Sequence, residues 1–180
     1  YYDTCMRVCD DLINDFEDKE KGGFFFTSNQ HEQLFYRPKS ISDDSVPSGL
    51  VYATDTLLYM GFISGNQKYI EAAHGALDFI YKSIDDNLTS SVSAINLLRE
   101  DNLEKEIIIV RTNKKTWEKI TDSEEYYGRC IIFIENELQN LPDYIAYKES
   151  KGEFTSYHCK GMTCQTPKLS FEDFIDSLKT

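Results

Sequence analysis

The side chains best suited to chemistry gather in one polar loop, residues 37–49. The loop offers a guanidinium, an ammonium group, two neighbouring carboxylates and a serine hydroxyl just before an apolar helical pattern. Loops held on a rigid scaffold are common binding sites, and the N-terminus of a helix attracts negative charge. The candidate ligand-binding residues are therefore Arg37, Lys39, Asp43, Asp44 and Ser48.

A purely structural role would explain the same loop. Arg37 would pair with a loop carboxylate, Pro38 would hold an extended turn, and Ser48 would cap the following helix. Ion pairs are common in protein loops, and an ion pair alone marks no binding site. The sequence leaves both interpretations open.

A second candidate is a pair of thiols, Cys159 and Cys164, with His158 beside the first. Structural zinc needs four ligands, and no second cysteine pair lies nearby in the sequence. The spacing therefore favours a structural or reversible thiol pair over the two alternatives, a metal site and two unrelated thiols, and we expect no metal and no cofactor. Cys5 and Cys9 lie one helical turn apart on a predicted apolar stripe, where both are expected to pack as small apolar groups.

No familiar catalytic motif accompanies these candidates. The sequence has no glycine-rich phosphate loop, nucleophile elbow, Cys-x-x-Cys pair or His-Glu-x-x-His helix. His31 and His74 are isolated in the sequence and indicate no catalytic pair. The residues alone therefore name no reaction.

Composition and charge exclude several classes of protein. The 180 residues include 31 acidic and 19 basic side chains, a net charge of −12, and 41% are hydrophobic. The apolar fraction predicts a folded chain, and the negative charge argues against nucleic acid as a partner. The sequence has no apolar run long enough to cross a bilayer and no leader pattern at its start, so we expect no membrane partner and a cytoplasmic location.

Apolar periodicity predicts a helical first part, residues 1–101. The predicted helices cover residues 2–16, 48–64, a stretch that reaches 84, and about 90–99. The glycines at 22 and 23 interrupt this pattern, and two apolar runs, 24–27 and 33–37, predict a β-hairpin. Helices joined by short turns indicate antiparallel helical hairpins with one β-hairpin insert.

Residues 105–180 predict a small α/β module. The predicted strands are 107–110, 130–134, 144–147 and 154–159, and the predicted helices are 114–120 and 171–178. Continuous apolar runs flanked by charge are typical of strands covered on both faces. A strand, a helix and a strand in succession indicate a βαβ unit, so the fold class is mixed α and α/β.

Several separated motifs follow one another in an order that is shared with a known protein family. They are Gly22-Gly23-Phe24-Phe25-Phe26-Thr27, Arg37-Pro38-Lys39, Asp43-Asp44, Val46-Pro47-Ser48-Gly49, Tyr157-His158-Cys159 and Cys164-Gln165-Thr166-Pro167. In this order and spacing the chain resembles the C-terminal region of the YyaL-like, spermatogenesis-associated thioredoxin-domain proteins. One position departs from the family pattern, because Leu50 stands where an Asn usually follows Pro-Ser-Gly.

This resemblance implies that the chain is the C-terminal part of a longer protein. The family has a thioredoxin-like domain, then an (α/α)6 barrel of the six-hairpin glycosidase type, related in fold to N-acylglucosamine 2-epimerases, and last a small α/β unit. Residues 1–101 would be the final hairpins of that barrel. A helical pattern already under way at Tyr2, and a first residue other than Met, agree with this expectation. The family's redox motif is absent from this sequence.

Two functions follow as expectations. In the first, the mouth of the barrel binds a carbohydrate or similar polyol through the loop residues, and an epimerase-like or glycosidase-like activity belongs to the parent protein. In the second, the chain is a non-catalytic scaffold that supports the thioredoxin-like domain or another partner, with Cys159 and Cys164 serving stability. Helices that normally close a ring would expose apolar faces here, so self-association is also expected.

Overall fold

The named strands all lie in the C-terminal part of the chain, whereas helices occur in both parts. The computed structural model describes residues 1–32, 35–84, 88–102, 106–139, 141–161 and 163–179. It confirms a mixed α and β fold class and divides into two compact units, Tyr1–Leu103 and Glu104–Thr180. In the part of the chain that it describes, no helix is both long and apolar enough to span a bilayer.

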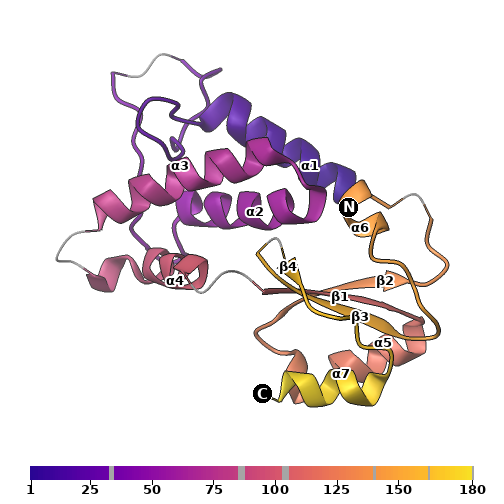
Figure 1. The fold of residues 1–180 in the computed structure, drawn as a ribbon. Helices are drawn as coiled ribbons and strands as arrows, with labels where there is room; N and C mark the ends of the chain where they lie inside the picture. Colours follow the sequence, from indigo (N-terminus) through magenta and orange to yellow (C-terminus); the bar gives the residue numbers. More distant parts are fainter. Residues whose placement is uncertain (33–34, 85–87, 103–105, 140, 162, 180) are drawn as a thin grey trace. The chain divides into compact units, whose positions relative to one another are not determined.

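Unit 1 is built from helices (Figure 1). They are α1 (Tyr2–Asp11), the π-helical turn η1 (Leu12–Phe16), α2 (Gly49–Ser64), α3 (Gln67–Ser83), the short 3-10 turn η2 (Leu88–Ser90) and α4 (Val92–Asn102). The predicted helices are confirmed, with small shifts at their ends. Helix α2 contacts α1, α3 and α4, so it is the central helix of this unit.

The central position of α2 follows from its sequence. The helix is apolar around most of its circumference, and Leu57 and Leu58 are fully buried; a helix that is apolar on all sides is stable only when neighbours cover it. Burying one such side chain stabilises the fold by about 1.5 to 3 kcal/mol. A Cβ atom at Gly61 would lie 2.6 Å from the side chain of Ile70, so α2 and α3 approach this closely only because residue 61 is glycine.

Helix α1 is fixed to α3 by Tyr69. The Tyr69 side chain is fully buried, and its hydroxyl lies 3.0 Å from the Met6 carbonyl oxygen and 2.9 Å from Asp10 Oδ1. Cys9 packs in the same core, and burial raises the pKa of its thiol to about 11. Cys5 is exposed, so the prediction that both thiols are buried is wrong for Cys5. The face of α1 that packs against the core of unit 1 includes Met6 and Cys9 but not Cys5.

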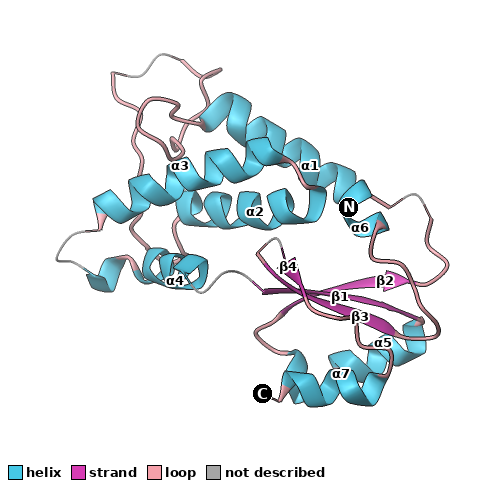
Figure 2. Ribbon diagram, in the orientation of Figure 1, coloured by secondary structure: helices cyan, strands magenta, loops and turns pink. Residues whose placement is uncertain are grey.

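The predicted β-hairpin is not formed by the described residues between 17 and 48, which form an irregular loop (Figure 2). Residues 33 and 34, in the second predicted strand, lie outside the described residues. The backbone N–H of Phe25 donates to the Phe16 carbonyl at 2.8 Å, and that of Phe26 donates to the Pro38 carbonyl at 2.9 Å. Because these two backbone N–H groups already donate to carbonyl oxygens in different segments, they are not free to pair with a neighbouring strand.

Unit 2 is a four-stranded sheet with helices (Figure 1). Its elements are β1 (Glu106–Thr112), α5 (Lys114–Thr121), the 3-10 turn η3 (Glu124–Tyr126), β2 (Cys130–Glu135), α6 (Asp143–Ala146), β3 (Thr155–Lys160), β4 (Thr163–Cys164) and α7 (Phe171–Leu178). The strand order is β2-β1-β3-β4, in which β1 pairs in parallel with β2 and antiparallel with β3, and β3 pairs antiparallel with β4. The βαβ prediction is confirmed by β1, α5 and β2.

One predicted strand of this unit is wrong, because residues 143–146 form the short helix α6. The N–H groups of Ile145 and Ala146 both donate to the Pro142 carbonyl, at 2.9 and 2.8 Å. Proline favours the start of a helical turn since its missing N–H is not needed there. A four-residue apolar run does not distinguish a strand from one turn of helix.

The two faces of the sheet differ. Alternate residues of β1 point to opposite faces, and Ile108 and Val110 pack in one apolar cluster with residues of α5 and α7, both of which lie on the same side of the sheet (Figure 1). The other face carries Ile109 and then Arg111, near the end of the strand. The sheet therefore places one buried cation at the carboxyl ends of its parallel strands.

Candidate functional site

Arg37 is held inside its loop. Its Nη2 donates to the carbonyl oxygens of Thr27 at 2.5 Å and Asp15 at 3.3 Å. The centre of the guanidinium lies 4.1 Å from the centre of the Phe25 ring, close enough for a cation–π contact. Its Nε is buried and has no hydrogen-bond partner among the described residues. Two of these contacts lie within the loop, at Phe25 and Thr27, and the contact with Asp15 joins the loop to η1.

Lys39 forms a buried ion pair. Its Nζ donates to Asp18 Oδ2 at 2.6 Å and to the Gly22 carbonyl at 2.8 Å, and it lies 4.0 Å from the centre of the Phe79 ring. The side chains of Lys39 and Asp18 are only 9% and 11% exposed. Three partners around one ammonium group leave little of it available to a ligand.

The carboxylate of Asp18 is equally well held. Burial favours its neutral form, but hydrogen bonds from Lys39 and from the backbone N–H groups of Lys21 and Glu20 outweigh this and lower the pKa of Asp18. The turn that supplies these groups depends on Gly22, with a φ of 72°, where a Cβ atom would lie 2.1 Å from the Gly75 carbonyl oxygen. The ion pair is therefore fixed where the loop contacts α3.

Asp43 joins the starts of two helices. Its carboxylate accepts hydrogen bonds from the Ser48 N–H at 3.0 Å, the Ser93 N–H at 2.8 Å and the Ser93 hydroxyl. Burial acts to raise the pKa of Asp43, but these donors outweigh it and lower the pKa. Because a negative charge is stabilised at a helix N-terminus, one carboxylate here stabilises both α2 and α4.

Ser48 and Asp44 have different surroundings. Ser48 is buried, donates its hydroxyl to the Ser40 carbonyl at 2.7 Å, and accepts from the Val51 N–H at 3.4 Å as the N-cap of α2. Asp44 is exposed. The structure thus brings Asp43, Asp44 and Ser48 together at the start of α2. Arg37 and Lys39 instead contact η1, the turn at residues 18–22, the loop residues 25–27 and α3.

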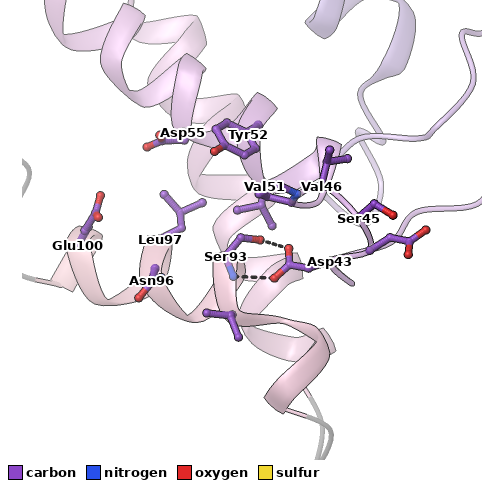
Figure 3. A pocket seen from close by; sticks show the side chains of 13 residues that line it. Asp43, Ser45, Val46, Val51, Tyr52, Asp55, Ser93, Asn96, Leu97 and Glu100 are labelled. Carbon is purple, nitrogen blue, oxygen red and sulfur yellow. Dashed lines mark hydrogen bonds between the residues drawn. The ribbon is translucent and has the colours of Figure 1, made fainter. Parts of the chain in front are cut away.

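A pocket of about 390 Å³ opens beside this polar group, and its walls are α2, α4 and the loop (Figure 3). Its lining residues are Asp43, Asp44, Ser45, Val46, Pro47, Val51, Tyr52, Asp55, Val92, Ser93, Asn96, Leu97 and Glu100. Tyr52 and Asp55 come from α2, and Asn96 and Glu100 come from α4. Neither Arg37 nor Lys39 lines it.

Sequence reasoning missed the helical residues of this pocket. Tyr52 and Asp55 lie three residues apart on α2, and Asn96 and Glu100 four apart on α4, which is ordinary spacing for the outer face of a helix. Asp55 and Glu100 both take part in interactions within the chain. Tyr52 is 56% exposed, so its ring offers an apolar face to a ligand.

A second pocket of about 520 Å³ lies on the other side of the loop. It is lined mainly by apolar groups, among them Phe16, Phe24 and Phe25, with Asp44 and Ser48 at its polar side. Asp44 therefore lines both pockets. Of the five predicted ligand-binding residues, only Asp44 is exposed and next to a pocket.

The two predicted tail thiols form a disulfide. Cys159 and Cys164 are direct partners across β3 and β4, and their sulfur atoms are bonded. The Lys148 Nζ lies 3.1 Å from the Cys164 sulfur. His158 is buried on the same strand, and its pKa is lowered mainly by burial. Among the described residues, no group of three metal-ligating side chains occurs.

No protein-family model matches this sequence, and no curated protein matches it at a significant level.

Proposed function

We propose that unit 1 binds a neutral carbohydrate or polyol in the pocket between α2 and α4. The observation that supports this is the composition of the pocket wall, in which carboxylate side chains and the amide of Asn96 line the same pocket as the exposed ring of Tyr52. Sugar hydroxyls donate hydrogen bonds to carboxylates, and the C–H face of a sugar ring packs against an aromatic ring. The acidic lining also opposes binding of an anion.

The proposal includes the larger protein to which the resemblance points. We infer that the chain is the C-terminal part of a YyaL-like, thioredoxin-domain protein and that α2 and α3 are one hairpin of its (α/α)6 barrel. The order of the separated motifs supports this inference. The sugar pocket would then lie at the barrel mouth, with an epimerase-like or glycosidase-like reaction carried out by the whole protein.

The test compares two exposed tyrosines. Tyr52→Ala removes the ring from the pocket, and Tyr81→Ala removes a ring that is 73% exposed on α3, outside the pocket. Saturation-transfer NMR with glucose, N-acetylglucosamine and maltose is expected to show contact with the wild-type chain and with Tyr81→Ala, and to lose it with Tyr52→Ala. Equal signals for the two variants, or none with the wild-type chain, would contradict the proposal.

A second candidate is a non-catalytic scaffold, favoured by the contacts of the loop. Lys39, Asp43 and Ser48 all form hydrogen bonds with other parts of the chain, and Ser48 caps α2 as the structural interpretation of the loop expects. Such a loop would serve to hold α2, α3 and α4 in place. A scaffold predicts no sugar contact with the wild-type chain, whereas the carbohydrate proposal expects a contact that Asn96→Ala weakens.

A further inference from the structure

The most unusual charge in unit 2 is Arg111, near the end of β1. The side chain is buried, with the residue only 6% exposed. Its Nη2 donates to the Asn136 carbonyl at 3.1 Å, and its Nε has no hydrogen-bond partner among the described residues. None of the carboxylates that the structure describes forms an ion pair with it. Burial therefore lowers the pKa of Arg111.

The buried guanidinium of Arg111 lacks hydrogen-bond acceptors, within the described part of the chain, for some of its N–H groups. Buried charges in proteins are normally paired, because removing an ion from water without a partner destabilises the fold. Arginine presents five N–H donors in a planar fork that matches a carboxylate. Arg111 thus has donors to spare in a place where water competes weakly for them.

The surroundings of Arg111 form a pocket of about 370 Å³. Polar side chains of Asn136, Gln139 and Ser150 line it, together with the apolar side chains of Leu138 and Leu141. The pocket lies beside the carboxyl ends of the parallel strands β1 and β2, and ligands of open α/β sheets bind at such ends.

One wall of this pocket is rigidly held. The Asn136 amide nitrogen donates to the Gly152 and Glu153 carbonyls at 3.2 and 3.1 Å, and its amide oxygen accepts from the Ser150 hydroxyl at 2.9 Å. The pocket is therefore prepared before a ligand arrives, which lowers the entropy lost on binding.

The negative charge of Glu149 restricts the kind of anion that this pocket can bind. Glu149 lines the pocket and is exposed to solvent. Its negative charge opposes a multiply charged anion such as phosphate more than a single carboxylate. Leu138 and Leu141 offer contact to a short aliphatic chain.

We propose that the Arg111 pocket is a binding site for a small monocarboxylate, which accepts hydrogen bonds from the guanidinium and packs its carbon chain against the two leucines. This site belongs to unit 2 and does not depend on sugar binding in unit 1. It also gives a reason for placing a cation directly after four buried apolar residues of the same strand.

Calorimetric titration of the full chain with sodium butyrate, butyramide and sodium phosphate tests the site. Saturable binding of butyrate with Kd near or below about 1 mM is expected, while the uncharged butyramide and phosphate bind more weakly. Arg111→Lys is expected to weaken butyrate binding about tenfold or more, since it loses the planar fork. Arg129→Lys is the matched control and should keep wild-type affinity.

A second pair of variants tests the pocket independently, in case Arg111→Lys does not fold. Ala146→Trp adds bulk at an exposed position that lines the pocket, and Tyr147→Trp adds an indole next to it, outside the lining. Loss of butyrate binding in Ala146→Trp with retention in Tyr147→Trp supports the proposal. Absence of saturable butyrate binding, equal binding of butyramide, tighter binding of phosphate, or unchanged affinity in Ala146→Trp would each overturn it.

Discussion

Unit 1 and unit 2 each bury a cation, and the two cations differ in their partners. Lys39 has the Asp18 carboxylate, a carbonyl oxygen and an aromatic ring around it. Arg111 has one carbonyl oxygen and, among the described residues, no carboxylate. A buried charge with a complete set of partners indicates a structural role, whereas one that lacks them indicates a place for a ligand.

The comparison changes how the polar loop of unit 1 is interpreted. The sequence predicts Arg37 and Lys39 as ligand-binding residues, but the structure gives them internal contacts, as it does Asp43 and Ser48. The binding that we propose for this unit therefore involves the pocket side chains of α2 and α4. Density of polar residues in a sequence is thus a poor guide to a site when the residues satisfy one another.

The largest expected effect is that of Lys39→Met. The change leaves Asp18 buried without its cation, and breaking a buried ion pair in this way destabilises a protein by about 3 kcal/mol or more. Urea unfolding of the variant should show this loss, while Lys82→Met, at an exposed position of α3, should unfold like the wild-type chain. A decrease of less than about 1 kcal/mol in the free energy of unfolding would contradict the structural role of the Lys39–Asp18 ion pair.

The disulfide of unit 2 comes next. Replacing Cys159 and Cys164 together with serine opens a short covalent loop, and the loop-entropy relation gives a loss of about 2 kcal/mol. Thermal unfolding should show the difference in oxidising buffer and lose it when the wild-type chain is reduced. Cys5→Ser, at an exposed free thiol, is the control. Equal melting of the double variant and the oxidised wild-type chain would contradict this role.

Acid should weaken unit 1 through Asp43. The pKa of this carboxyl is lower in the folded chain than its ordinary value of 3.8, so its stabilising contribution is complete above pH 3.8 and is lost as the pH falls through the lower folded value. Asp43→Asn removes the charge at every pH and should flatten this part of the stability curve. Urea midpoints measured above and below pH 3.8 test it, and parallel curves for both chains would contradict the account.

The smallest expected effect on stability is that of Arg111→Met. Replacing an unpaired buried charge with an apolar side chain removes a desolvation penalty and one hydrogen bond, so the free energy of unfolding should change by less than about 1 kcal/mol or rise. Chemical unfolding measures this directly. A loss as large as that expected for Lys39→Met would show that Arg111 has a structural role.

Much of the fold could be predicted from local signals. Ser48 and Ser170 are the N-caps of α2 and α7, and each accepts a hydrogen bond from a backbone N–H three residues later. The apolar runs at 107–110 and 130–134 predicted the paired strands β1 and β2. These elements depend on residues close together in the sequence, so their patterns are visible there.

The remaining features depend on distant partners. Phe25 and Phe26 lie in an apolar run that is typical of a strand, but their backbone N–H groups donate to the carbonyl oxygens of Phe16 and Pro38. No local sequence pattern predicts these partners. The pocket residues Tyr52 and Asn96 resemble any outer helical positions until α2 and α4 are brought together.

Arg111 did have a signal in the sequence. A charged residue directly extends the apolar run of β1, and the strand continues through it to Thr112. The predicted strand ends at Val110 and so leaves Arg111 outside it. A charged residue within a buried strand is a candidate for a functional site.

One titration tests the distinction between the two units directly. The side-chain Nε–H signals of Arg37 and Arg111 can be followed by NMR in the full chain while sodium butyrate is added. Both Nε atoms are buried without a described partner, but only Arg111 lines a pocket with room for a carboxylate. We predict a saturable shift of the Arg111 signal and a stationary Arg37 signal; equal shifts of both signals, or no shift of Arg111, would contradict the account.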